Sequence, residues 1–173
     1  MKNRAIVPTA IEQVMREGEY IVSTTDPSGR ITSVNDVLVR FSGYSAEELI
    51  GRQHNILRHP DMPRSVFGMA WDSLGHGESF YGYIKNLSKD GSFYWVFAHI
   101  FPLYDEDGAL VGYKSIRRKP RQAALAPVVA LYADMRQAEE AAGAADAIAA
   151  GRAVLGACLA RQGQSYEEFV AAL

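Results

Sequence analysis

The feature that most constrains the fold is a run of three strand-like segments between residues 80 and 118, separated by two tight turns. The turns "KDG" and "DEDG" are typical of the short loops that join neighbouring antiparallel strands. Such loops are too short for the crossover connection that parallel strands need. The run therefore predicts three antiparallel strands, over residues 80–88, 92–104 and 109–118.

The middle strand of this run is apolar on both faces. From residue 93 to 103 the odd positions hold Phe, Trp, Phe, His, Phe and Leu, while Tyr94, Val96, Ala98 and Ile100 occupy the even ones. An antiparallel strand with one wet face alternates instead. We therefore expect short helices and a pocket on one face, and the terminal helices or a second subunit on the other. A homodimer is the favoured prediction.

Local signals place the other elements. Two β-rich segments, 20–26 and 31–35, flank the turn "PSGR" and predict a hairpin. Apolar spacing predicts a longer helix from Pro63 to Leu74. Helix-capping patterns predict three further helices, a leading one from Thr9 to Gly18, one through Phe41 capped by Asn35 or Asp36, and one from Ser45 to Gly51.

These elements predict an α+β fold, with a five-stranded antiparallel sheet and short helices over one face. We divide the chain into an N-terminal helical cap (1–19), a core domain (20–120) and a helical C-terminal extension (121–173). The extension is rich in alanine, and its glycines divide it into two helices, followed by a short one capped by Ser165 and Glu168.

Composition narrows the classes of function. A net charge of −2 gives no general reason to bind nucleic acid, and the single cysteine, Cys158, excludes a disulfide framework. The N-terminus lacks the apolar core of a signal peptide, and the longest apolar run, 123–133, is too short to span a bilayer. We find no nucleotide-binding glycine loop and no hydrolase serine motif. We expect a cytoplasmic protein, without a membrane span, that is not an enzyme.

One polar segment, "HNILRHPDMP" at residues 54–63, stands directly before the longer helix. Its prolines stiffen the backbone, and Asp61 is placed to cap that helix, but neither role uses Arg58 or His59. Both side chains suit a polar or phosphorylated ligand. Asn86 shares one side of its strand with Phe80 and Gly82, where its amide offers donors and an acceptor to a flat ring.

Four segments together resemble a PAS domain: "ITSVNDVLVRFSGYSAEELIG", "HNILRHPDMP", "KDGSFYWV" and "VGYKSIRRKP". The second is most similar to the FAD-carrying PAS sensor of bacterial aerotaxis receptors, and the likeness covers about residues 20–120. The tail shows neither a long hydrophobic anchor nor an extended heptad helix, which indicates a stand-alone member. The cofactor-binding residues that the resemblance and the residue chemistry imply are Asn35, Arg58, His59, Asp61, Phe67, Trp71, Phe80 and Asn86.

The resemblance implies a flavin-binding sensor of redox state or oxygen, which signals to an unidentified partner protein. One departure is Phe80, since aerotaxis receptors have tryptophan there. Two alternatives stay open. The first is a cofactor-free dimerisation module with its cavity filled by Phe80, Trp71 and Phe93. The second is a haem sensor with His59 as the axial ligand.

Overall fold

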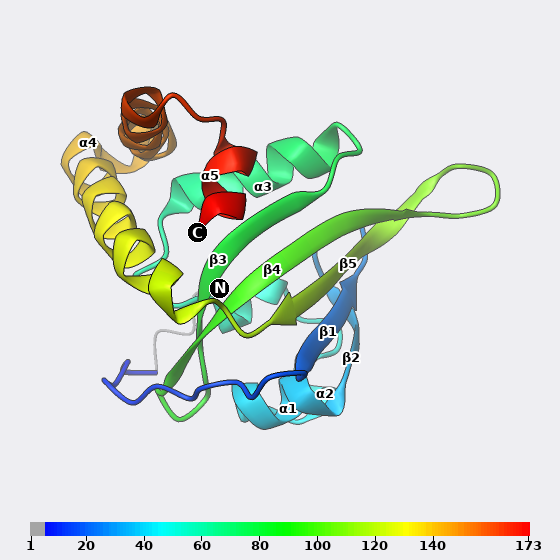
Figure 1. Ribbon diagram of the computed structural model, residues 1–173. Coiled ribbons are helices and arrows are strands. Elements are labelled where there is room, and N and C mark those ends of the chain that lie inside the picture. Colours follow the sequence, from blue (N-terminus) through cyan, green and yellow to red (C-terminus); the bar gives the residue numbers. More distant parts are fainter. Residues whose placement is uncertain (1–5) are drawn as a thin grey trace.

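The computed structural model describes residues 6–173 and contains the predicted sheet (Figure 1). All neighbouring strands are antiparallel, and their order is β2-β1-β5-β4-β3. The strands are β1 (Tyr20–Thr25), β2 (Ile31–Val34), β3 (Phe80–Leu87), β4 (Phe93–Tyr104) and β5 (Leu110–Arg118). The fold class and the five strands predicted from the sequence are therefore confirmed.

Short helices lie between β2 and β3 in the sequence and cover one face of the sheet, which we call the inner face (Figure 1). Asn35 caps α1 through its side chain, and Ser45 and Glu48 form the predicted capping box of α2. The segment consists of α1 (Asp36–Ser42), α2 (Ala46–Leu49), the 3-10 helix η1 (His54–Leu57) and α3 (Arg64–Gly75). The local capping signals thus placed α1 and α2 correctly.

The predicted N-terminal helix is wrong. The segment around Thr9 and Glu12 is extended, and its backbone pairs with the start of β4 through Phe93 and Gly91. This pairing satisfies backbone groups at the end of the sheet, and it outweighs the local capping pattern. Met15 is buried, whereas three other apolar side chains of the segment are exposed, namely those of Val7, Ile11 and Val14.

The C-terminal extension is helical, as predicted. It forms α4 (Gln122–Gln162), whose backbone is non-helical at Gly143, and α5 (Tyr166–Ala172), which Ser165 caps. The kink divides α4 into the two predicted helices. By length and composition alone α4 is apolar enough to cross a membrane, and 17% of its most apolar window is buried, but one such helix is weak evidence of a membrane span.

The outer face of the sheet is covered unevenly. The Tyr132 ring on α4 lies 6.2 Å from that of Trp95, and its hydroxyl donates to the Tyr83 carbonyl oxygen at 2.9 Å. Further along, Tyr81 stacks on His99 with ring centroids 4.3 Å apart and remains largely exposed. Residues 6–173 thus cover only part of the outer face of β4, the strand that is apolar on both faces.

Candidate ligand cavity

A cavity of about 270 Å³ lies between α3, η1 and the inner face of the sheet. Its apolar wall comes from Phe67, Ala70, Trp71 and Leu74 on α3 and from Ile84 and Ile100 on the strands. The Trp71 ring meets the edge of the Tyr113 ring at a centroid distance of 5.5 Å. Four of the predicted binding residues line the cavity: Arg58, Phe67, Trp71 and Asn86.

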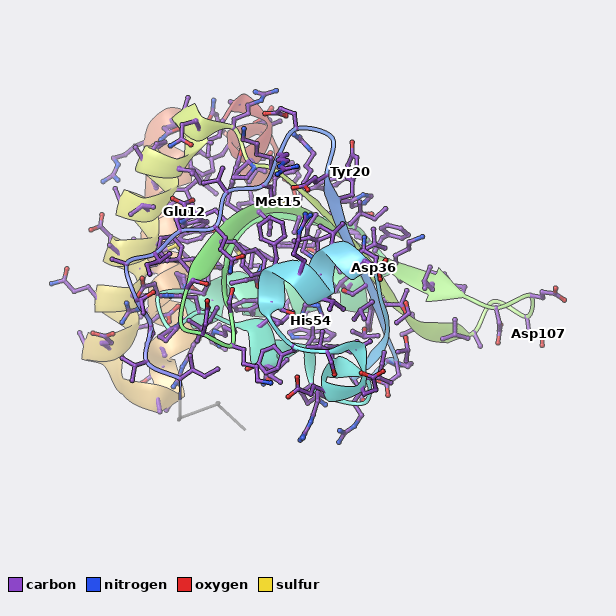
Figure 2. The ribbon with its side chains drawn as sticks, turned by 90° about the horizontal axis from the view of Figure 1, so that it is seen from below. Glu12, Met15, Tyr20, Asp36, His54 and Asp107 are labelled. Atoms are coloured by element: carbon purple, nitrogen blue, oxygen red, sulfur yellow. The ribbon has the colours of Figure 1, made fainter. Side chains whose placement is uncertain are left out.

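Polar side chains line the rest of the cavity. The strands contribute Ser23, Thr25, Ser115 and Arg117, and η1 and its flanks contribute Gln53, His54 and Asn55. Figure 2 shows His54 among the short helices that cover the inner face, near α1. Aromatic and aliphatic side chains thus line the cavity together with hydrogen-bonding groups, which is the composition typical of a small-molecule site.

Arg117 is the most unusual residue of the cavity. Its side chain is 1% exposed and forms no ion pair with any carboxylate of residues 6–173. Nη2 donates to Ser23 Oγ and to His54 Nε2, whereas Nε and Nη1 have no partner in the described chain. Burial lowers the pKa of Arg117 to about 10, so the guanidinium stays charged at neutral pH.

His54 is neutral, chiefly because it is buried. Its Nε2 lies 3.2 Å from Nη2 of Arg117, a group that only donates, so this nitrogen accepts the hydrogen bond. Burial, with the positive charge of Arg117 as a second cause, lowers the pKa of His54 to about 3. The lone pair of His54 Nε2 is therefore already used in a hydrogen bond. The haem alternative named His59, which does not line this cavity.

Asn86 and Arg58 bring further donors. Asn86 is 4% exposed, and its Nδ2 has no partner in the part of the chain that the structure describes. The Arg58 guanidinium lies 4.8 Å above the Phe67 ring and donates from Nη2 to the Met62 carbonyl oxygen at 2.7 Å. Backbone pairing between Arg58 and Asn86 holds the two residues next to each other.

The predicted residues His59 and Asp61 lie on the other side of this corner and do not line the cavity. His59 Nδ1 accepts from the Asp61 backbone N–H at 3.0 Å, and burial lowers the pKa of His59 to about 4. The Asp61 carboxylate pairs with Lys85 at 2.7 Å and with Arg136 of α4 at 3.2 Å. Both side chains therefore face β3 and the tail.

The N-terminus of α3 is capped by the tail and not by Asp61, which corrects the sequence-based expectation. Glu139 of α4 is buried, and its carboxylate accepts from the backbone N–H of Arg64 at 2.8 Å and from that of Ser65 at 2.9 Å. The Ser65 hydroxyl donates to the same carboxylate at 2.6 Å. An anionic group of the protein therefore already occupies this helix terminus.

Two other predicted residues lie elsewhere. Asn35 uses its whole amide on the backbone, accepting from Val22 and Leu38 and donating to Tyr20. Phe80 is buried and stacks on Tyr166 of α5 at a centroid distance of 6.0 Å. Neither lines the cavity, and neither does Phe93. Of the three side chains expected to fill the interior of a cofactor-free module, only Trp71 reaches it.

The fold and this cavity define the class of protein. A PAS-fold family model matches residues 31–117, which is half of the chain and contains four of the five strands, α3 and Arg117. The chain belongs to the PAS family.

Curated relatives agree with this assignment. The chain is 44% identical to the aerotaxis receptor of Escherichia coli (strain K12) over 112 residues, which cover 65% of this chain and 22% of that one. It is 27% identical to the nitrogen fixation regulatory protein of Klebsiella pneumoniae, over 61% of this chain and 21% of that one. The matched region thus spans about a fifth of the length of these relatives.

Solved structures share the fold. A PAS domain from Colwellia psychrerythraea is 28% identical with a TM-score of 0.54, covering 58% of this chain and 86% of that one. A light-oxygen-voltage domain studied with a flavin analogue has a TM-score of 0.56 at 23% identity, covering 64% of this chain and 83% of that one. The chain is therefore a PAS sensor domain extended by a helical tail.

Proposed function

We propose that this PAS domain binds a flavin in the cavity and acts as a sensor of redox state or oxygen, not as an enzyme. The observation that carries the proposal is the set of buried donors without partners among the residues that line the cavity. Arg117 and Asn86 together leave three buried N–H-bearing nitrogens unsatisfied in the described chain. Since a buried unsatisfied donor costs about 1–3 kcal/mol, such a set favours a ligand that supplies acceptors.

The chemistry of an isoalloxazine fits this lining. Its benzenoid side is apolar and suits Phe67, Ala70 and Trp71, while its carbonyl oxygens and ring nitrogens can accept hydrogen bonds from donors of the lining such as those of Arg117 or Asn86. The fold is also that of a light-oxygen-voltage domain studied with a flavin analogue. The aerotaxis receptors that the chain resembles carry FAD, which makes FAD the proposed cofactor.

The volume of the cavity indicates how much of the cofactor it holds. About 270 Å³ lies just below the range of about 300–1,000 Å³ usual for small-molecule sites, which suits the flat ring and not a whole dinucleotide. A second cavity of about 630 Å³ shares Asn55 and Arg58 with the first and is also lined by Arg64 and Arg136. Glu139 and Glu140 line the same second cavity, so its arginines already face carboxylates and do not by themselves mark a site for the phosphates of FAD.

A bound flavin would supply reversible electron transfer, and the chain would respond through its hydrogen bonds. Asn86 presents both a donor and an acceptor, so it can re-pair when the ring edge changes its protonation. Trp71 and Phe67 stand on α3, which is therefore the element that contacts the ligand most extensively. A change at the ring would reach α3 through these side chains.

The tail is the proposed receiver of this change. Glu139 holds the N-terminal end of α3, and Arg152 pairs with Asp72 near its C-terminal end at 2.6 Å. A movement of α3 therefore changes both contacts. We propose that the tail, or a partner protein bound to it, carries the signal in the cytoplasm, and that the exposed Val7, Ile11 and Val14 contribute to a homodimer.

Absorption spectroscopy of the purified protein tests the flavin. We expect the bands of a protein-bound flavin near neutral pH, and their bleaching by dithionite. Arg58→Ala and Asn86→Leu should each lower the affinity for FAD at least tenfold, and Arg40→Ala, an exposed arginine on α1, should leave it unchanged. A colourless protein that takes up no added FAD would refute the proposal, and a Soret band would indicate haem instead.

A further inference from the structure

We infer that Arg117 is the charge partner of the ligand, and that the cavity consequently binds a flavin more tightly when its ring edge carries a negative charge. The inference rests on the proposed flavin site. The inference goes further than the proposed site because it assigns to Arg117 the preference for reduced over oxidised flavin. The residue lies on β5, outside the segment at residues 54–63 that directed attention to a ligand.

Arg117 holds a buried positive charge that forms no ion pair among residues 6–173. A buried ion without a counter-ion loses its hydration and gains no Coulomb energy in return, so proteins rarely keep one without a use. The neighbours of Arg117 do not compensate it. His54 is neutral, Ser23 contributes a hydroxyl, and Tyr94 contributes a buried hydroxyl with no hydrogen-bond partner in residues 6–173.

Neighbouring side chains hold the Arg117 guanidinium in one position at the wall of the cavity. Ser23 and His54 hold one nitrogen, Nη2, and both of these residues line the cavity with Arg117. The other two nitrogens remain available as donors. On the neighbouring strand Ala98 lies opposite Arg117, so no large side chain of β4 competes for this space. The guanidinium is thus fixed at the cavity wall before any ligand arrives.

Reduction of the flavin ring places a negative charge on the ligand. Dithionite transfers two electrons to the ring and is itself oxidised to sulfite, while one proton from water forms the N5–H bond. The reduced ring then carries one negative charge at N1 and the adjacent carbonyl. A fixed cation in a cavity of low dielectric constant stabilises that charge far more than it stabilises the neutral oxidised ring. The affinity for the reduced ring should therefore be the higher one.

The adjacent Arg118 provides a matched control. It follows Arg117 on β5 and so points to the opposite face, where its guanidinium lies exposed, 4.7 Å above the Phe97 ring. The variants Arg117→Met and Arg118→Met remove the same charge and nearly the same volume one residue apart. A third variant, Arg117→Lys, keeps the charge and loses the planar donor group.

Thermal melting separates a ligand-binding role from a structural one. If Arg117 is held ready for a ligand, the ligand-free Arg117→Met protein should melt about 2–4 °C higher than wild type, because it no longer buries an unpaired charge. Its stabilisation by added FAD should fall to less than half that of wild type. A lower melting temperature of the ligand-free variant would mean that Arg117 is structural, and would overturn the inference.

The second measurement compares the dissociation constants of oxidised and dithionite-reduced FAD. Wild type and Arg118→Met should bind the reduced form at least tenfold more tightly, which corresponds to a two-electron potential about 30 mV more positive than that of free FAD. Arg117→Met should lose this preference and Arg117→Lys should retain part of it. Equal ratios in all four proteins would refute the role of Arg117 and leave the flavin site standing, whereas wild type that binds no FAD would refute both.

Discussion

The two sides of α3 differ in how their polar groups are paired. On the side of the cavity, Arg117 and Asn86 keep buried nitrogens without partners in the described chain. On the side of the tail, the Glu139 carboxylate accepts three hydrogen bonds, and Asp61 pairs with both Lys85 and Arg136. Both regions are polar. The carboxylates of the tail side are paired within the chain, although His59 Nε2 and Arg152 Nε on that side also have no partner in the described residues.

This difference separates the polar groups that are available to a ligand from those that hold the fold together. Buried polar groups of a folded domain are almost always hydrogen-bonded, so a complete network needs no further molecule. An incomplete network beside a cavity is explained by a ligand that completes it. The comparison therefore predicts that substitutions on the tail side lower the stability of the domain, whereas substitutions of the unpartnered donors on the cavity side lower its affinity for the ligand.

The largest effect is expected at Glu139. Glu139→Ala removes the cap of α3 and strands two backbone N–H groups and a buried hydroxyl, which should cost about 2–4 kcal/mol of the free energy of unfolding. Urea denaturation measures this loss. Glu140→Ala is the matched control, because its exposed carboxylate only pairs with Arg136, and we expect a loss below about 1 kcal/mol. Equal losses in the two variants would contradict the proposed cap.

The next effect concerns pH. The folded-state pKa values of His54 and His59 are lowered to about 3 and about 4 from an ordinary value of 6.5, chiefly by burial, so protons bind preferentially to the unfolded chain. Stability is therefore complete above pH 6.5 and is lost as the pH falls. Between pH 7 and pH 5 the loss should be on the order of 2 kcal/mol for each histidine.

Unfolding midpoints measured across this pH range test the prediction. His54→Gln should remove about half of the pH dependence, and the same change at His76, an exposed residue after α3, should leave it intact. A stability that stays constant from pH 7 to pH 5 would show that neither ring is buried in its neutral form.

The smallest effect is expected at Asn35, whose side chain caps α1 and also accepts from the Val22 backbone. Asn35→Ala should lower the free energy of unfolding by about 1–2 kcal/mol, as is usual for the loss of an N-cap. Asp36→Ala, one residue later on the exposed side, should cost less than half as much. If the two substitutions cost the same, the cap contributes nothing beyond helix propensity.

Much of the fold followed from local signals. The glycine turns marked the hairpins, and the Ser45–Glu48 and Ser165–Glu168 boxes marked helices that the structure confirms. The prediction of an N-terminal helix was wrong because the backbone of this segment pairs with β4, about 80 residues later in the chain. A local capping pattern carries no information about so distant a partner. Glu139 was missed for the same reason, since the helix that it caps lies 74 residues earlier.

Of the eight binding residues predicted from the sequence, four line the cavity. Phe67, Trp71 and Asn86 could be predicted because the periodicity of α3 and β3 places them on an inner face, whereas Arg58 was predicted from the polar segment at residues 54–63 and its resemblance to PAS sensors. Arg117 was overlooked, although strand alternation places it on the same face as the cavity residues Tyr113 and Ser115. Its burial depends on α1–α3 covering that face, which is a property of the assembled fold.

The central claim, that the cavity beneath α3 is where the flavin binds, is tested most directly by blocking that cavity. Ala70 is buried on α3 and lines the cavity, so Ala70→Phe fills the space proposed for the ring, whereas Ala133→Phe places the same side chain on the exposed surface of α4. Titration of FAD should give a dissociation constant at least thirtyfold weaker for Ala70→Phe and an unchanged one for Ala133→Phe, with both proteins still melting cooperatively. If a folded Ala70→Phe protein binds FAD as tightly as wild type, the flavin does not bind in this cavity.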